Sequence, residues 1–158
     1  MENIYMIECE EEKDKIAGIN LLNKTFSGAT NQKTLTWHEA ALKYKKHKPL
    51  MVCAKDHEKV ISVCNWLPWK FVYKGKMYLA YQSCEGATDN AYRGKGLWRE
   101  VIKYGNNLLA GRDIDFSFCF PATLSYYPLC RAGYHPVGAF KYRARVINAF
   151  RRRNKEED

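Results

Sequence analysis

The segment that decides the fold reads Thr88-Asp-Asn-Ala-Tyr-Arg-Gly-Lys-Gly-Leu-Trp98. It follows residues 77–84, a nearly continuous run of apolar and aromatic residues that is typical of a strand covered on both faces. It precedes residues 96–111, in which apolar residues recur at helical spacing. The segment is therefore expected to join a central strand to a long helix.

Four residues of this segment predict a site for a diphosphate. A helix N-terminus presents unpaired backbone N–H groups and about half a positive charge. Gly94 and Gly96 allow an anion to approach the backbone, while Arg93 and Lys95 add full charges. Neither the phosphate-binding pattern G-x-x-x-x-G-K-[ST] nor the complete dinucleotide pattern G-x-G-x-x-G is present.

Hydrophobic periodicity divides the rest of the chain into strands and helices. The expected strands are residues 4–8, 50–54, 60–67, 77–84, 115–120 and 134–147. The expected helices are a first one from Glu10 that Gly28 ends, a second from Thr34 or Thr36 through Tyr44 before Pro49, and then 96–111 and 125–132, with Gly133 as the cap of the last. The order β-α-α-β-β-β-α-β-α-β predicts an α/β (α+β) fold with a hairpin-rich sheet rather than a doubly wound parallel one.

Composition predicts one soluble domain, residues 1–150, followed by a charged tail, residues 151–158. Of 158 residues, 46% are hydrophobic and 27% charged, and no stretch has the length and apolarity of a membrane span or a signal peptide. The net charge of +9 favours an anionic ligand or partner. The six cysteines include no pair with C-x-x-C spacing, so we expect free thiols in a reducing cytoplasm and no metal site.

The stretch Tyr92-Arg-Gly-Lys-Gly-Leu97 resembles the acyl-CoA motif R/Q-x-x-G-x-G/A of the GNAT superfamily of N-acyltransferases. The order of elements over residues 50–146 is also similar to that family. The resemblance implies a mixed, mostly antiparallel central sheet with helices on both faces. It further implies direct transfer of an acetyl group from acetyl-CoA to the amine of a small molecule, such as an amino sugar, without a metal.

The resemblance also implies where acetyl-CoA binds. A bulge at Gly86 would separate the central strand from the next one. The backbone of Gly86, Ala87 and Thr88 would pair with the pantetheine arm. The residues expected around the pyrophosphate are Arg93, Gly94, Lys95, Gly96, Leu97 and Trp98.

Three positions depart from the family pattern. Trp98 replaces the last small residue of the motif, and Ala122 occupies the place where the family usually has Asn. The Tyr often used as general acid aligns with Leu129, with Tyr126 and Tyr127 close by as alternatives.

Direct acetyl transfer requires a general base, a polarised carbonyl and a proton for the leaving thiolate. Glu85 is the one carboxylate on the central strand, so it is a candidate base, although it would equally serve as an ion-pair partner for a neighbouring strand. Tyr126 and Tyr127 are the candidate acids. The patch Trp66–Trp69 is a candidate contact for the acceptor.

Two other functions compete with this one. Leu129 and Ala122 are compatible with an acyl-CoA-binding module that lacks catalysis. The tail and the cluster Lys43–Lys48 are compatible, less strongly, with a nucleic-acid binder. The single closing strand leaves a sheet edge that a second copy would fill, which suggests a homodimer; no membrane partner is expected.

Overall fold

A computed structural model describes residues 3–26 and 47–139. The strands are β1 (Ile4–Glu8), β2 (Leu50–Asp56), β3 (Lys59–Tyr73), β4 (Lys76–Thr88) and β5 (Phe116–Phe118). The helices are α1 (Glu12–Thr25), the short 3₁₀ turn η1 (Asn90–Tyr92), α3 (Leu97–Ala110) and α4 (Thr123–Arg131). The second predicted helix and residues 140–158 lie outside the described residues.

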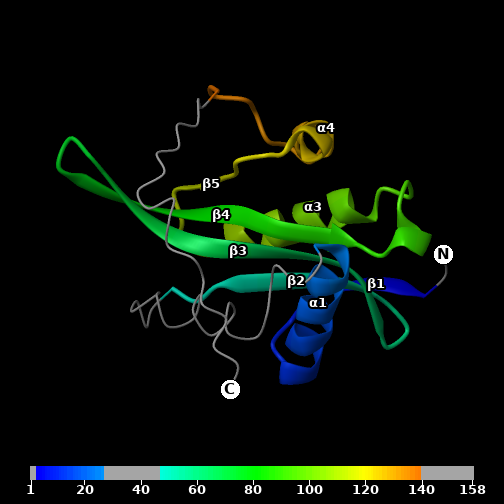
Figure 1. Cartoon of the computed structure of the whole chain (residues 1–158). Coiled ribbons are helices and arrows are strands. Elements are labelled where there is room, and N and C mark those ends of the chain that lie inside the picture. The colour runs from blue at the N-terminus through cyan, green and yellow to red at the C-terminus, as the bar shows by residue number, and fades with distance from the viewer. Residues whose placement is uncertain (1–2, 27–46, 140–158) are drawn as a thin grey trace, which may run out of the picture.

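The five strands form one sheet in the order β1-β2-β3-β4-β5 (Figure 1). The first four strands are antiparallel to their neighbours, and β5 runs parallel to β4. This parallel step requires a crossover, which α3 supplies. The predicted mixed and mostly antiparallel sheet is confirmed.

Helices cover both faces of the sheet, with α3 and α4 on one side and α1 on the other (Figure 1). Side chains alternate along β2, so that Leu50 and Val52 contact the α3 layer while Met51 and Cys53 contact the α1 layer. Burial on both faces explains why the central strands read as continuous apolar runs.

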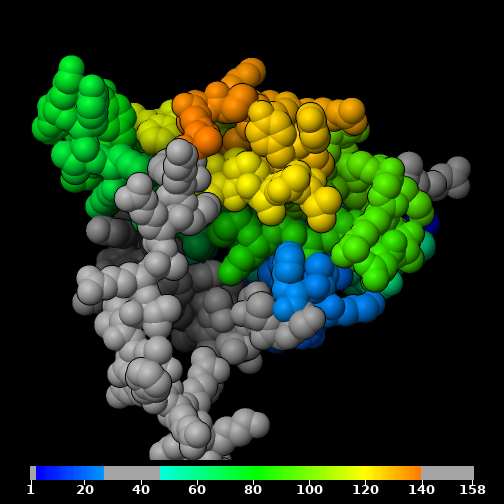
Figure 2. All heavy atoms as spheres, turned by 45° about the horizontal axis from the view of Figure 1, so that its top comes forward, coloured from blue at the N-terminus to red at the C-terminus, as the bar shows by residue number. Residues whose placement is uncertain are grey.

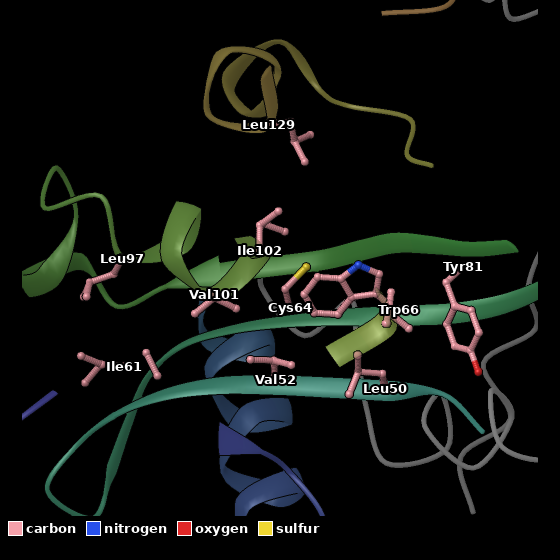
Figure 3. Packing of buried hydrophobic residues seen from close by; sticks show 12 residues of the cluster. Leu50, Val52, Ile61, Cys64, Trp66, Tyr81, Leu97, Val101, Ile102 and Leu129 are labelled. Carbon is pink, nitrogen blue, oxygen red and sulfur yellow. The ribbon is translucent and has the colours of Figure 1, made fainter. Parts of the chain in front are cut away.

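The core under α3 is centred on Trp66, which is fully buried (Figure 3). A Cβ on Gly105 of α3 would collide with the Trp66 ring, so the helix approaches the strand through this glycine. Leu129 of α4 belongs to the same cluster. Trp66 is therefore a core residue, and the prediction that it contacts the acceptor is wrong.

The β3–β4 hairpin is longer than the sequence pattern predicts, and it extends beyond the other strands (Figure 1). The pairing of β3 with β2 ends at Trp66. Pro68 therefore lies in a part of β3 that, among the described strands, pairs with β4 alone, and a strand tolerates proline at such an edge. The turn at Lys74 and Gly75 has positive φ at both residues, as a tight hairpin requires.

The end of the described chain differs from the prediction. Gly133 caps α4 with a φ of +100°, and the N–H of Tyr134 reaches the carbonyl of Leu129, as expected for a glycine cap. Residues 134–139 are not a strand, because Pro136 lacks a backbone N–H and no ladder forms there among the described residues. Within the described ranges, no helix has the length and apolarity needed to cross a bilayer.

Candidate active site at the open edge of β4

Strands β4 and β5 pair over three positions and then separate. The pairs run from Ala80 with Phe116 to Gln82 with Phe118. In the described part of the chain, residues 83–88 of β4 have no strand partner on the β5 side. Figure 2 shows the green surface of β4 between the yellow segment of β5 and α4 and the blue α1. An open strand edge offers N–H and C=O groups to an extended ligand.

A β-bulge occurs in this unpaired stretch. Val63 pairs with Ala87 and Asn65 with Cys84, so two residues of β4, Glu85 and Gly86, lie opposite one residue of β3. The predicted bulge at Gly86 is confirmed. The left-handed residue, however, is Glu85, with a φ of 49°, a conformation that costs a non-glycine residue about 1–3 kcal/mol.

The Glu85 carboxylate accepts a hydrogen bond of 2.8 Å from the side-chain amide of Asn65 on β3. Asn65 is buried, and its other amide atom, Oδ1, finds no hydrogen-bond partner among residues 3–26 and 47–139. The structure thus places a buried amide with a spare acceptor beside the candidate base. Sequence reasoning missed Asn65, although it is a polar residue within the apolar run 60–67.

Cys84 is adjacent to Glu85 but is poorly suited to be a nucleophile. Burial, followed by the negative charge of Glu85, raises the pKa of the Cys84 thiol to about 12. A thiol nucleophile reacts as the thiolate, which is scarce at neutral pH under these conditions. Cys84 is therefore not a suitable nucleophile.

Asp89 organises the loop that follows β4. Its carboxylate accepts the backbone N–H of Ala91 at 3.1 Å and lies 3.3 Å and 3.6 Å from the ammonium groups of Lys59 and Lys24. The N–H of Asp89 also donates to Ile61 of β3. The Ala91 N–H first, and then the two lysines, hold the pKa of Asp89 below its usual range.

Tyr92 ties the loop to the β2–β3 hairpin. Its hydroxyl donates to Asp56 Oδ2 at 2.6 Å, and this hydrogen bond lowers the pKa of Asp56. The ammonium groups of Lys59 and Lys95 lie 5.4 Å and 5.1 Å from the centre of the Tyr92 ring, within cation–π distance. Asp56 was not predicted, because only the tertiary structure brings the hairpin to the loop.

The glycines of the loop adopt the conformation that their positions require. Gly94 and Gly96 have φ values of +77° and +75°, and Gly96 directly precedes α3. In the described chain no side chain caps this helix, so its first N–H groups remain available for an anion. Arg93 and Lys95 are exposed, and Arg93 Nε donates to the carbonyl of Thr88 at 3.1 Å.

Trp98 packs its indole ring against Gly86. A Cβ at Gly86 would collide with Nε1 and neighbouring ring atoms of Trp98. The large residue is on the helix and the small one is on the strand, so the bulge and the first turn of α3 are complementary in shape.

Comparison with known proteins decides the family. Residues 9–137 match the family model described as the acetyltransferase (GNAT) domain. The chain belongs to the GNAT family of acetyltransferases. The match covers most of the chain, including β4, the glycine loop and α3. A comparison with curated protein sequences finds no match.

Solved GNAT structures share the fold at low sequence identity. The glucosamine-6-phosphate N-acetyltransferase of Arabidopsis thaliana superposes with a TM-score of 0.68 at 10% identity, covering 92% of this chain and 99% of that one. An aminoglycoside 6'-N-acetyltransferase of Acinetobacter haemolyticus gives 0.67 at 13% identity, covering 91% and 99%. An acetyltransferase of Trypanosoma brucei gives 0.66 at 13% identity, covering 90% and 98%.

The two candidate tyrosines, Tyr126 and Tyr127, lie on α4 of this GNAT domain. Leu129, which the resemblance aligns with the family's usual tyrosine, is buried in the core and offers no proton. Tyr126 lies one turn before Leu129 and is 39% exposed, whereas Tyr127 is on the opposite side and 72% exposed. Ala122, where many family members have Asn, precedes α4 and has no polar side chain.

The described residues hold no group of three His, Cys, Asp or Glu side chains that would bind a metal ion.

Proposed function

We propose that this GNAT domain binds acetyl-CoA at the β4–α3 junction and transfers the acetyl group directly to the amine of a small molecule. The observation that carries the proposal is the coincidence of an open strand edge with an uncapped, glycine-rich helix start. When bound, acetyl-CoA supplies an activated acetyl thioester. The residues assigned to it are Gly86, Ala87 and Thr88 for the pantetheine arm, and Arg93, Gly94, Lys95, Gly96, Leu97 and Trp98 for the pyrophosphate.

Glu85 is the proposed general base. An amine arrives as an ammonium ion and must lose a proton before it attacks, and the Glu85 carboxylate accepts that proton. Asn65 orients the carboxylate through its 2.8 Å hydrogen bond. A backbone N–H at the bulge, at Ala87 or Thr88, polarises the thioester carbonyl.

Tyr126 is the proposed general acid, in preference to Tyr127. Tyr126 is less exposed than Tyr127 and lies one turn before the core residue Leu129, which supports this choice. Its phenol would donate a proton to the leaving thiolate, whereas the aliphatic side chain of Leu129 has no proton to give.

The proposed acceptor is a small amine such as an amino sugar. The structural neighbours include enzymes named for glucosamine 6-phosphate and for aminoglycosides, which supports this class. All six cysteines are free of disulfides, which supports a cytoplasmic setting. We also propose a homodimer, to be tested by light scattering.

Calorimetry with coenzyme A tests the cofactor site through Gly96→Glu, which fills and charges the cradle. We expect the variant to lose measurable binding. Gly75→Glu is a matched control, since Gly75 has nearly the same φ, +76°, at a remote hairpin turn; a Cβ would meet nothing within 4 Å there and makes only an ordinary contact with Arg99 at Gly96. Undiminished affinity in Gly96→Glu, or equal loss in both variants, would contradict the assignment.

An acyl-CoA-binding module without catalysis is the second candidate, and Leu129 and Ala122 favour it. It predicts tight coenzyme A binding with no acetyl transfer to any member of a broad panel of amines. Transfer to one amine at a competent rate excludes it, while binding without transfer favours it over the enzyme.

A further inference from the structure

The end of the β3–β4 hairpin exposes large apolar side chains. Val72, Tyr73 and Met77 are 71%, 63% and 60% exposed, respectively. The hairpin extends beyond the other strands in Figure 1, and its green tip stands out from the surface at the upper left of Figure 2. Apolar side chains gathered on a projecting surface mark a site of interaction with a partner or a membrane.

The exposed apolar side chains lie on both faces of the hairpin. Val72 pairs with Met77, so these two side chains share one face. Tyr73 pairs with Lys76 and lies on the opposite face. A partner protein would pack against one face of such a ribbon, whereas a lipid layer surrounds a projecting ribbon and contacts both. The distribution of apolar side chains therefore favours a lipid layer.

The charge of the hairpin is entirely positive. Residues 66–81 contain three lysines and neither Asp nor Glu. The ammonium group of Lys74 lies 5.3 Å from the centre of the Tyr73 ring, and that of Lys76 lies 4.9 Å from the centre of the Tyr78 ring. Tyrosine rings are enriched at membrane–water interfaces, and lysines are attracted to anionic headgroups. The tip thus combines the two kinds of side chain that the headgroup layer favours.

The same charge disfavours a contact between two copies of this hairpin. Placing two tips together would bring their lysines close to one another, and like charges repel. An anionic lipid surface attracts each of these lysines instead. Charge therefore favours lipid headgroups over a second tip.

We propose that the tip of the β3–β4 hairpin binds the surface of a membrane that contains anionic lipids. Val72, Tyr73 and Met77 enter the boundary between headgroups and acyl chains, and the lysines contact the lipid phosphates. This contact is peripheral and needs no membrane-spanning helix. It goes beyond the proposed function, because the glycine loop follows the opposite end of β4 and stays accessible while the tip is bound.

Flotation with lipid vesicles tests the proposal on the full chain. One set of vesicles is pure phosphatidylcholine, and the other contains about 30% phosphatidylglycerol, which supplies the negative charge. The chain should bind the anionic vesicles at least about 10-fold more tightly than the neutral ones. Raising the salt concentration should reduce this preference, because salt screens the lysines.

A double variant, Val72→Ser with Met77→Ser, removes the apolar contact. It should bind the anionic vesicles about 10-fold more weakly than the wild type. The matched control is Ile16→Ser with Leu124→Ser, which removes two exposed apolar side chains from α1 and α4 and should bind like the wild type. Circular dichroism checks that both variants keep the fold.

A second double variant, Lys74→Gln with Lys76→Gln, tests the charge independently. It should lose most of the preference for anionic over neutral vesicles. Its control is Lys13→Gln with Lys103→Gln, which removes the same net charge from exposed positions on α1 and α3 and should keep the preference.

Three results would overturn the membrane contact: no binding of the wild type to anionic vesicles, undiminished binding by the Val72 and Met77 variant, or equal losses in a hairpin variant and its control. A wild type that binds no vesicles but self-associates in light scattering, through contacts that the same variant abolishes, would assign the tip to a second copy instead. Coenzyme A takes no part in these measurements, so they are independent of the proposed function.

Discussion

At the scale of single residues, Glu85 combines an unfavourable backbone conformation with the candidate chemistry. Its φ of 49° belongs to the region that glycine adopts freely, yet glycine occupies the next position. Strain of about 1–3 kcal/mol persists at a site where the surrounding structure enforces it, and such strain clusters at active sites. At Glu85, the pairing of β3 with β4 on both sides of the bulge enforces this backbone conformation. In this conformation the Glu85 carboxylate accepts the hydrogen bond from Asn65.

Glu85→Gln tests that role. The glutamine keeps a similar shape but is not a base, so we expect kcat to fall about 10²- to 10⁴-fold while the affinity for coenzyme A stays the same. Steady-state kinetics with an accepted amine and calorimetry measure the two quantities. Glu12→Gln, at an exposed position of α1, serves as the control. Full activity in Glu85→Gln would remove Glu85 from the mechanism.

At the scale of elements, α3 is held at the distance from the sheet that the site requires. The contact between Gly105 and Trp66 brings the helix close, and Trp98 against Gly86 fixes its first turn under the bulge. In both contacts a tryptophan ring packs against a glycine. In the first the glycine is on the helix and the tryptophan on the sheet, and in the second the positions are reversed. The N-terminus of α3 is thereby positioned beside the open edge of β4.

Gly105→Ala should destabilise the domain by about 1–3 kcal/mol, because the added methyl collides with a fully buried ring. The free energy of unfolding in urea measures this change. Gly111→Ala, at the end of the same helix and in ordinary contact with Leu108, should differ from the wild type by well under that amount. Equal effects of the two substitutions would mean that the close approach at Gly105 is unimportant.

At the scale of the molecule, Asp89 connects three parts of the chain: α1 through Lys24, β3 through Lys59 and the loop through Ala91. These partners lower its pKa in the folded state. A carboxylate with a depressed folded pKa stabilises the protein above its unfolded pKa of about 3.9, and this stabilisation disappears as the pH falls through the folded value.

Asp89→Asn should therefore lower the stability at pH 7 and make the loss of stability in the range below about pH 4 less steep than in the wild type. At the acid end of this range the two proteins should converge. Urea unfolding followed over a pH series measures the difference. Parallel curves for the two proteins would show that Asp89 does not titrate with the folding equilibrium.

The sequence was sufficient to predict most elements, the bulge at Gly86, the cap at Gly133 and the glycine loop. The elements, the cap and the glycine loop depend on local patterns: the period of apolar residues, and the few residue types that positive φ permits. The bulge was expected from the resemblance to the GNAT family. The length of β3 and β4, the burial of Trp66 and the unpaired start of residues 134–139 were not predicted. They depend on which strands have neighbours, and local patterns do not contain that information.

The net charge of +9 also shows the difference between what the sequence determines and what the tertiary structure determines. By itself, the sequence determined that the chain is basic and that two of its bases lie in a glycine-rich helix start. Only the tertiary structure decided that Asn65 lies beside Glu85, that Asp56 and Asp89 hold the loop, and that the Trp98 indole faces Gly86. The physical reason is that these pairs join separate elements, and their contacts exist only after the sheet and helices have packed.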